Sequence, residues 1–197
     1  TPRSDPGCTM SERASPLTPE QQSALADARD RTATFSPAAR IASFNAWSIG
    51  FFAVVSILFG IASLTSLVVG IGLAVVARNE FVGGARVRAL NPSGFELLWR
   101  NQVAFMALII GYCFWSMYRA VATPDPQMAE LTELLGDGTE ELVQSLTLTV
   151  YAVVIAATLI FQGLNARYYY VRLARLQSFI KDTPPWVLDV QRSVTPK

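Results

Sequence analysis

One uninterrupted apolar stretch dominates the pattern of hydrophobic and polar positions. Residues 46–77 are thirty-two positions without a charged side chain, and their polar residues are chiefly serine and threonine. As one helix this stretch would be about 48 Å long, because an α-helix rises about 1.5 Å per residue. The hydrocarbon core of a bilayer is only about 30 Å thick. The length therefore favours two helices, with a turn in the most polar part of the stretch, residues 62–66.

Two further apolar segments follow, at residues 102–118 and 145–166. Together with the first stretch they predict four membrane spans, at about 46–62, 66–82, 101–119 and 143–166. We therefore expect an all-α polytopic integral membrane protein. Its fold would be a four-helix transmembrane bundle in which the first two spans form a tight hairpin.

The distribution of basic residues supports the hairpin. With four spans, the segment up to Arg40, the 78–101 connection and the part after span four lie on one side of the membrane. They carry 5, 4 and 6 of the 16 Lys and Arg residues, which leaves only Arg119 on the other side. The positive-inside rule then predicts that both termini are cytoplasmic, in a bacterial inner (plasma) membrane. A shallow re-entrant hairpin over 46–77 gives the same charge count and remains an alternative.

The segments outside the spans divide the chain further. Residues 1–36 form an N-terminal cytoplasmic segment, in which 1–17 are predicted to be disordered. A capping box at Thr18–Gln21 then starts a short helix. The membrane domain covers 37–182, and 183–197 form a C-terminal tail. We interpret the glycine pair at 83–84 and the segment 91–94 as helix breakers in the 78–101 connection. We expect another short helix in the acidic outer loop, at residues 127–135.

Composition excludes several classes of function. The chain has no histidine and two cysteines, Cys8 and Cys113, one in a polar segment and one in an apolar segment. A disulfide framework and a Cys/His metal site are therefore not expected. No span has an ionisable side chain between its ends, which argues against proton- or sodium-coupled transport and against acid–base catalysis. No nucleotide or hydrolase motif is present. We expect no enzyme, no catalytic residue, no cofactor and no nucleic-acid partner.

Small residues recur at four-residue spacing in the first two spans. Such spacing lets helix backbones approach closely where lipid supplies no hydrophobic driving force. Packing within the hairpin is the first interpretation, and an interface between copies of the chain is the alternative. The small residues concerned are Gly50, Ser56, Gly60, Ser66, Gly70 and Ala74.

Each span also has an asparagine near its predicted cytoplasmic end, with further amide and carboxyl groups close by. In a four-helix bundle these side chains would converge at one depth. The simpler interpretation is interhelical hydrogen bonding and helix capping. The functional alternative is a cytoplasm-facing pocket or a docking point for a partner. The predicted polar cluster contains Asn45, Asn79, Glu80, Asn101, Gln102, Gln162 and Asn165.

The segment after span four is basic and rich in tyrosine. Arg167, Arg172 and Arg175 are candidates for contact with anionic lipid headgroups. An ordinary positive-inside anchor with an aromatic belt is the simpler interpretation.

These patterns favour a non-enzymatic structural, assembly or accessory subunit. Its partners would be the lipid bilayer and other membrane subunits, or further copies of itself in a homo-oligomer. The alternative is an oligomeric channel or uncoupled transporter for a small solute. Its pore would be lined by hydroxyl groups, with Ser56, Ser63, Thr147, Thr149 and Thr158 as candidates.

Overall fold

The computed structural model describes residues 17–60, 63–122 and 138–194, and every regular element in these ranges is an α-helix. The predicted outer-loop helix at 127–135, most of the predicted disordered segment 1–17 and Cys8 lie outside the described residues. The helices are α1 (Pro19–Ala33), α2 (Ser36–Phe59), α3 (Leu64–Arg88), α4 (Pro92–Ala122), α6 (Thr139–Asp182) and α7 (Pro185–Val194).

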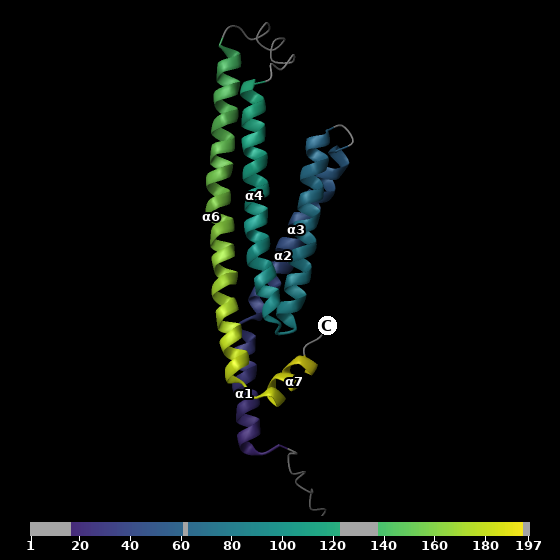
Figure 1. Cartoon of the computed structure of the whole chain (residues 1–197), viewed down its shortest axis with the longest axis vertical. Helices are drawn as coiled ribbons and strands as arrows, with labels where there is room; N and C mark the ends of the chain where they lie inside the picture. Colours follow the sequence, from purple (N-terminus) through teal and green to yellow (C-terminus); the bar gives the residue numbers. More distant parts are fainter. Residues whose placement is uncertain (1–16, 61–62, 123–137, 195–197) are drawn as a thin grey trace, which may run out of the picture.

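Four helices, α2, α3, α4 and α6, are long and apolar enough to cross a membrane. The predicted all-α, four-helix membrane fold is therefore confirmed. The helices form two hairpins, in which α2 packs along α3 and α4 packs along α6, and α3 joins the hairpins by packing on α4 (Figure 1). With 24 and 25 residues, α2 and α3 are each about 36 Å long, which is sufficient for a full crossing.

The α2–α3 hairpin turns between Phe59 and Leu64. The Ser63 hydroxyl caps α3 by accepting a hydrogen bond of 3.4 Å from the Ser66 backbone N–H. The small residues then let the two backbones approach. A Cβ at Gly70 would lie 2.7 Å from the Ile57 side chain, and a Cβ at Gly60 would lie 2.9 Å from the Leu67 backbone. These glycines therefore serve packing within the chain.

The connection between α3 and α4 is shorter than the sequence suggested. α3 continues to Arg88 and α4 begins at Pro92, so the interpretation of 83–84 as a helix break was wrong. Leu90 turns the chain with a φ of 53°. Gly83 is a packing site inside α3, because a Cβ there would lie 2.6 Å from the Leu98 side chain. Glycine at 83 thus allows α3 and α4 to cross closely just before the corner.

The end of the bundle with α1, α7 and the α3–α4 corner holds the main hydrophobic core, which we call the basal core (Figure 1). α1 starts with the predicted capping box and buries Ala28 there. The segment predicted as a C-terminal tail contains α7, whose Val187 and Leu188 are buried. The basal core consists of Ala28, Phe35, Ala38, Ala39, Ala42, Val87, Leu90, Phe95, Leu98, Tyr169, Leu176, Phe179, Val187 and Leu188.

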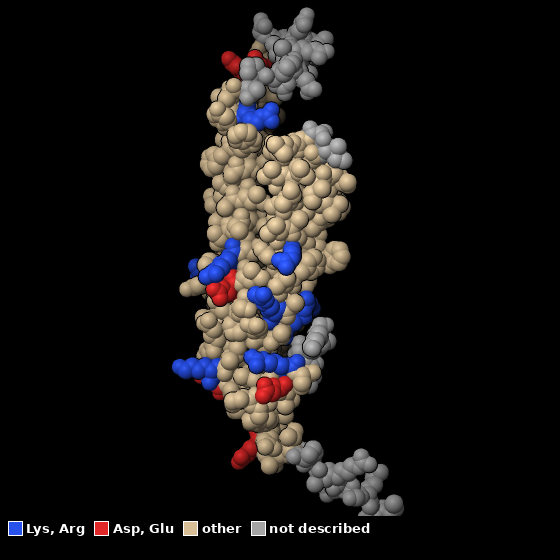
Figure 2. Space-filling view, turned by 45° about the vertical axis from the view of Figure 1, so that its right-hand side comes forward, with Lys and Arg blue, Asp and Glu red and all other residues tan. Residues whose placement is uncertain are grey.

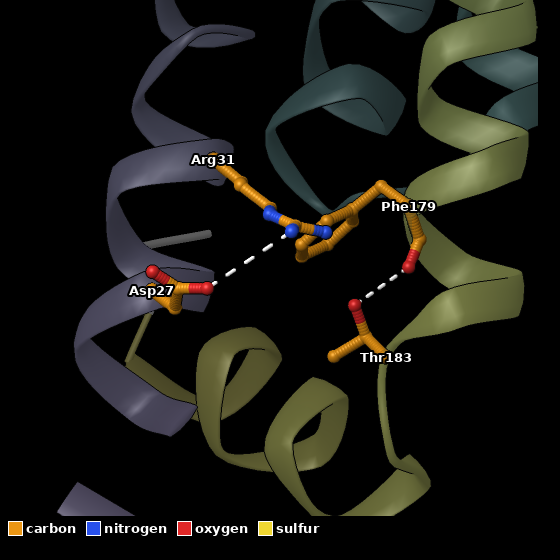
Figure 3. A network of polar contacts seen from close by, with 4 residues as sticks. All are labelled: Asp27, Arg31, Phe179 and Thr183. Atoms are coloured by element: carbon orange, nitrogen blue, oxygen red, sulfur yellow. Dashed lines mark hydrogen bonds and ion pairs between the residues drawn. The ribbon is translucent and has the colours of Figure 1, made fainter. Parts of the chain in front are cut away.

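A side-chain bond closes α6 beneath this core (Figure 3). The Thr183 hydroxyl donates to the Phe179 carbonyl over 2.6 Å, at the point where α6 ends and the chain turns into α7. The ring of Phe179 packs on Phe35, whose ring also meets that of Phe95. The basal core thus joins the starts of α2 and α4 to the end of α6.

The opposite part of the bundle, which we call the distal half, is open. It contains the ends of α2 and α4, the start of α3 and the first part of α6, and the α2–α3 hairpin diverges there from α4 and α6 (Figure 1). An apolar cleft of about 250 Å³ separates the hairpins. Figure 2 shows an uncharged surface over most of this half, and basic side chains gathered lower on the same face. The cleft is lined by Ile49, Phe52, Ser56, Val69, Leu73, Phe105, Leu108, Ile109 and Tyr112.

Candidate buried polar layer

Part of the predicted polar cluster forms a connected layer between α3 and α4, at the boundary between the basal core and the distal half. The Asn101 amide donates to Glu80 Oε1 over 2.8 Å and to the Val76 carbonyl over 3.0 Å. Gln102 Nε2 donates to the same Glu80 oxygen over 2.8 Å. Asn79 Nδ2 donates to Asn101 Oδ1 over 3.2 Å. The carboxyl group of Glu80 is therefore held by two amides of α4.

The layer lies inside the protein. Glu80 is 0% exposed, Gln102 is 1% exposed and Asn101 is 3% exposed. Glu80 was placed near the end of the second span by the sequence, but α3 continues for two more turns beyond it. The helix therefore buries an ionisable side chain against α4. Burial of Glu80 against α4 was not expected from the sequence, although Glu80 was a predicted member of the polar cluster.

The local sequence explains why these groups point inward. Residues two positions apart on a helix lie about 200° apart around its axis. In three helices an arginine is followed two positions later by a buried polar residue, and all three arginines are on the outer surface. At this position along the long axis of the bundle, guanidinium groups therefore lie on the outer surface and buried polar side chains lie between the helices. The pairs are Arg78 and Glu80 on α3, Arg100 and Gln102 on α4, and Arg167 and Tyr169 on α6.

Tyr169 of α6 completes the layer. Its side chain is 0% exposed, and its ring packs at 6.4 Å from that of Phe95 and at 5.5 Å from that of Tyr168. The Asn45 side chain of α2 is a hydrogen-bond partner of its hydroxyl. Tyr169 was not among the residues predicted from the sequence, although the Arg-x-polar pattern shared with α3 and α4 was a signal for it.

Two oxygen atoms between α3 and α4 are buried without a hydrogen-bond partner, Glu80 Oε2 and Gln102 Oε1, and the Tyr169 hydroxyl has only the Asn45 side chain as a partner. Among the described residues Glu80 also forms no ion pair. Buried polar groups are nearly always satisfied in native proteins, and each unsatisfied group costs about 1–3 kcal/mol. The contact between α3 and α4 therefore leaves two hydrogen-bond acceptors without a donor, and one of them belongs to the carboxyl group of Glu80.

The other predicted members stay apart from this network. Gln162 and Asn165 are half-buried on α6, and no side-chain hydrogen bond within the described ranges joins them to Glu80. Gln162 Oε1 is buried without a hydrogen-bond partner. Asn45 of α2 is connected to the layer through its contact with the Tyr169 hydroxyl. The structure thus brings together the predicted groups of α3 and α4 and leaves those of α6 aside.

The predicted headgroup contacts differ among themselves. Arg172 donates to the Thr34 backbone carbonyl, and its guanidinium lies 4.4 Å from the centre of the Tyr168 ring. Arg172 therefore ties α6 to the junction of α1 and α2. Arg167 and Arg175 form no ion pair within the described residues, and their contact with lipid stays a prediction.

The hydroxyl groups suggested for a pore do not form one lining within a single chain. Ser56 borders the apolar cleft, and Thr158 is buried on α6, which has no extended contact with α2. Thr149 donates to the Ser145 carbonyl of its own helix over 2.8 Å. Within the part of the chain that the structure describes, no group of three His, Cys, Asp or Glu side chains is arranged for metal binding, and Cys113 is a free, buried thiol.

The fold and the layer define an all-α, multi-pass membrane protein in which one carboxyl group among the described residues, that of Glu80, is buried between two helices. No protein family, no curated protein and no solved structure matches this chain. Its function must therefore be inferred from its own geometry.

Proposed function

We propose that the protein is a non-enzymatic accessory or assembly subunit that binds a transmembrane helix of another membrane protein along α4. The observation that carries this proposal is the uncovered face of α4 in the distal half. Only 6% of the apolar window of α4 is buried within the chain, as in α6, against 33% in α3, and α4 is distinguished from α6 by the small residues described next. A closed four-helix bundle would cover one side of every span.

The uncovered face of α4 is lined by small residues. Ala104, Ala107 and Gly111 are exposed and lie at the three- and four-residue spacing that places them on one side of a helix. A Cβ at Gly111 would meet nothing within 4 Å, whereas one at Gly70 would meet Ile57 at 2.7 Å. Gly70 serves packing inside the chain, but Gly111 does not. A smooth, glycine-containing face is what an approaching helix backbone requires in lipid.

The orientation proposed with this function follows the basic residues. The basal core would lie in the cytoplasm with both termini, and the distal half would cross the inner membrane. The outward-facing arginines at the level of the buried layer would then lie at the cytoplasmic headgroups. This orientation would expose the Leu64 turn, where the side chain is 77% exposed, to the periplasm.

Thiol labelling tests the orientation. With Cys8 and Cys113 replaced by serine, Leu64→Cys should react with an impermeant thiol reagent applied to intact cells. Ala89→Cys, in the exposed α3–α4 corner, should react only after the cells are opened. The reverse labelling would contradict the proposed orientation.

Helix binding is tested by copurification from native membranes in mild detergent. Gly111→Leu should reduce recovery of the partner by about tenfold or more, because it obstructs the close approach of the backbones. Gly163→Leu on α6 is the matched control, because a Cβ there also meets nothing within 4 Å. This control should retain the partner. Equal recovery with both variants would contradict binding along α4.

A functional channel gives a different result. The pure protein alone would then release solute from liposomes, and Gly111→Leu would leave the flux unchanged unless the pore requires contact between copies through α4. Flux from the protein alone would replace the subunit proposal with the channel alternative.

A further inference from the structure

The contact between Glu80 and Gln102 has more hydrogen-bond acceptors than donors. Gln102 Nε2 and Asn101 Nδ2 both donate to Glu80 Oε1, over 2.8 Å each. Asn101 Nδ2 also donates to the Val76 carbonyl, and the Asn79 amide donates to Asn101 Oδ1. Glu80 Oε2 and Gln102 Oε1 are buried and receive none of these hydrogens. One hydrogen bond therefore joins two buried groups, each of which has an oxygen without a partner.

A single proton would satisfy both of these oxygens. An ionised carboxylate can only accept, whereas a protonated carboxyl group has one O–H donor. A proton on Glu80 Oε2 would therefore turn one unpaired acceptor into a donor for the other. A carboxylic acid and a primary amide are planar groups with one donor and one acceptor each, so they can pair through two hydrogen bonds in a ring. The bond from Gln102 Nε2 is the first of these, and a bond from Glu80 Oε2 to Gln102 Oε1 would be the second.

No ion pair within the described residues compensates a charge on Glu80. The arginines of the surrounding helices are exposed, and the one on α4 forms a 2.9 Å surface ion pair with Glu96. The buried tyrosine of α6 has the Asn45 side chain as its hydrogen-bond partner. Burying an ionised carboxylate without a partner is strongly unfavourable, and a proton removes this cost. The titratable side chains of this part of the bundle are Arg40 of α2, Arg78 of α3, Glu96 and Arg100 of α4, and Arg167 and Tyr169 of α6.

The Glu80–Gln102 contact lies where the two hairpins join. The packing of α3 on α4 connects the hairpins, and the apolar cleft between them begins directly beyond this contact. Phe105, one turn after Gln102, and Leu73, two turns before Glu80, both line the cleft. If Glu80 ionised, two acceptors would face each other at the base of the cleft, and the carboxylate would need water as a donor.

We propose that Glu80 is a neutral carboxylic acid whose proton binds it to Gln102, and that the contact between the hairpins loosens when Glu80 releases this proton to water. With the proton, Glu80 Oε2 donates to Gln102 Oε1 and the base of the cleft is closed. Without it, this bond is lost, and water enters between α3 and α4 to hydrate the carboxylate.

Infrared spectroscopy of the full chain tests the proton directly. The protein is measured at neutral pH in a detergent without carbonyl groups. A protonated carboxyl group has a C=O stretching band at higher frequency than amides and ionised carboxylates, and this band should be present and should shift in D₂O. It should disappear in Glu80→Gln and remain in Glu96→Gln, the matched control on the facing helix. Absence of the band, or its persistence in Glu80→Gln, would overturn the proposal.

Gln102→Leu tests the partner of the proton, and it keeps the proposal testable if Glu80→Gln fails to fold. It removes both the donor to Glu80 Oε1 and the acceptor for the Oε2 proton. The C=O band of Glu80 should therefore remain but move to higher frequency, because its hydrogen bonds to Gln102 are lost. A band at unchanged frequency would overturn the pairing with Gln102.

Thermal unfolding at different pH values tests the stabilisation. A proton that is held only in the folded state stabilises it at low pH, and this contribution is lost as the pH rises. Above about pH 5, where the unfolded chain has released the proton, the melting temperature should fall by about 3–5 °C per pH unit until folded Glu80 ionises. In Glu80→Gln the fall should be smaller by this amount, since an amide can form the same two bonds with Gln102. Equal pH dependence in the two proteins would overturn the proposal.

A distance between the hairpins tests the loosening itself. With Cys8 and Cys113 replaced by serine, spin labels are attached at Val68→Cys on α3 and Phe114→Cys on α4, both exposed positions in the distal half. The distance between the labels should increase at the pH at which the C=O band disappears. It should stay constant when Glu80→Gln is added. A distance that does not change as the band disappears would overturn the proposed loosening.

Discussion

The basal core and the distal half are built from the same helices but differ in how they pack. In the basal core, Phe95, Leu98 and Leu176 are fully buried. In the distal half, aromatic residues such as Phe114 and Phe161 are 59% and 67% exposed. Water drives apolar side chains together, whereas lipid tails are as apolar as the side chains themselves. In the orientation proposed above, this difference explains why the chain is compact at the end in water and open at the end in lipid.

α6 shows this difference within one element. Its 44 residues run through both regions, and only Thr158, Tyr169, Leu176 and Phe179 are buried. The last three lie in the basal core, near α1 and α7. The stability of the chain should therefore depend mainly on the basal core, and the distal half should tolerate substitution unless a partner binds there.

The largest effect is expected from Leu176→Ala. Leu176 is 0% exposed, so its truncation should lower the free energy of unfolding by about 2–5 kcal/mol through lost burial and a new cavity. The control is Leu164→Ala on the same helix, where the side chain is 61% exposed. It should change the free energy by less than about 0.5 kcal/mol. Denaturation in mild detergent measures both, and equal losses would refute the contrast between the two regions.

Gly94→Ala tests the same packing by adding a methyl group to the basal end of the bundle instead of removing side-chain volume. A Cβ at Gly94 would lie 2.7 Å from the Val87 nitrogen and 2.8 Å from the Gly83 oxygen, and this backbone cannot move aside cheaply. The expected loss is about 1–3 kcal/mol. Gly111→Ala should be neutral or stabilise the helix by up to about 1 kcal/mol, because it meets nothing and alanine favours helix. Melting curves of the two variants should therefore shift in opposite directions, or only that of Gly94→Ala should shift.

Arg172→Leu should have a moderate effect. The guanidinium donates to the Thr34 carbonyl and stacks on Tyr168, and together these contacts are worth about 1–2 kcal/mol. The loss should appear first as weaker protection of α1, because Arg172 ties the junction of α1 and α2 to α6. Hydrogen exchange of α1 measures it, with Arg175→Leu as the control on the same helix. Loss of protection in both variants would indicate a general surface effect.

The membrane fold could be predicted from the sequence because a long uncharged stretch is unfavourable in a water-soluble domain and favourable in a bilayer. The hairpin at residues 46–77 followed from length and charge, and the structure places its turn between Phe59 and Leu64. The basal core was missed because its residues come from several helices and show no common local pattern. The glycine pair at 83–84 was misinterpreted for a related reason. Glycine in a helix reports close packing as readily as a break, and only the position of Leu98 decides between them.

The polar layer shows the same limit at the level of side chains. Asparagines near the span ends predicted convergence, and the contacts of Asn79 and Asn101 agree with it. The angular position of each side chain around its helix axis then determined which of the predicted residues form hydrogen bonds with one another. Glu80 and Gln102 face inward, opposite to Arg78 and Arg100, but Gln162 and Asn165 do not reach the network. Arginines mark the outer side of each helix, and a residue two positions later lies on the opposite side. Applied to Arg78, Arg100 and Arg167, this rule selects Glu80, Gln102 and Tyr169.

The smallest effect is expected at the surface of the basal core. Asp27 and Arg31 form an ion pair of 3.9 Å on α1, and their side chains are 79% and 58% exposed (Figure 3). Asp27→Asn should change the free energy of unfolding by less than about 0.5 kcal/mol, and high salt should remove even this difference from the unaltered protein. Denaturation curves of both proteins at low and high salt measure it. A loss as large as that of Leu176→Ala would mean that surface charge, and not apolar burial, holds α1 in place. The basal core would then not be stabilised mainly by apolar burial, and its proposed contrast with the distal half would be refuted.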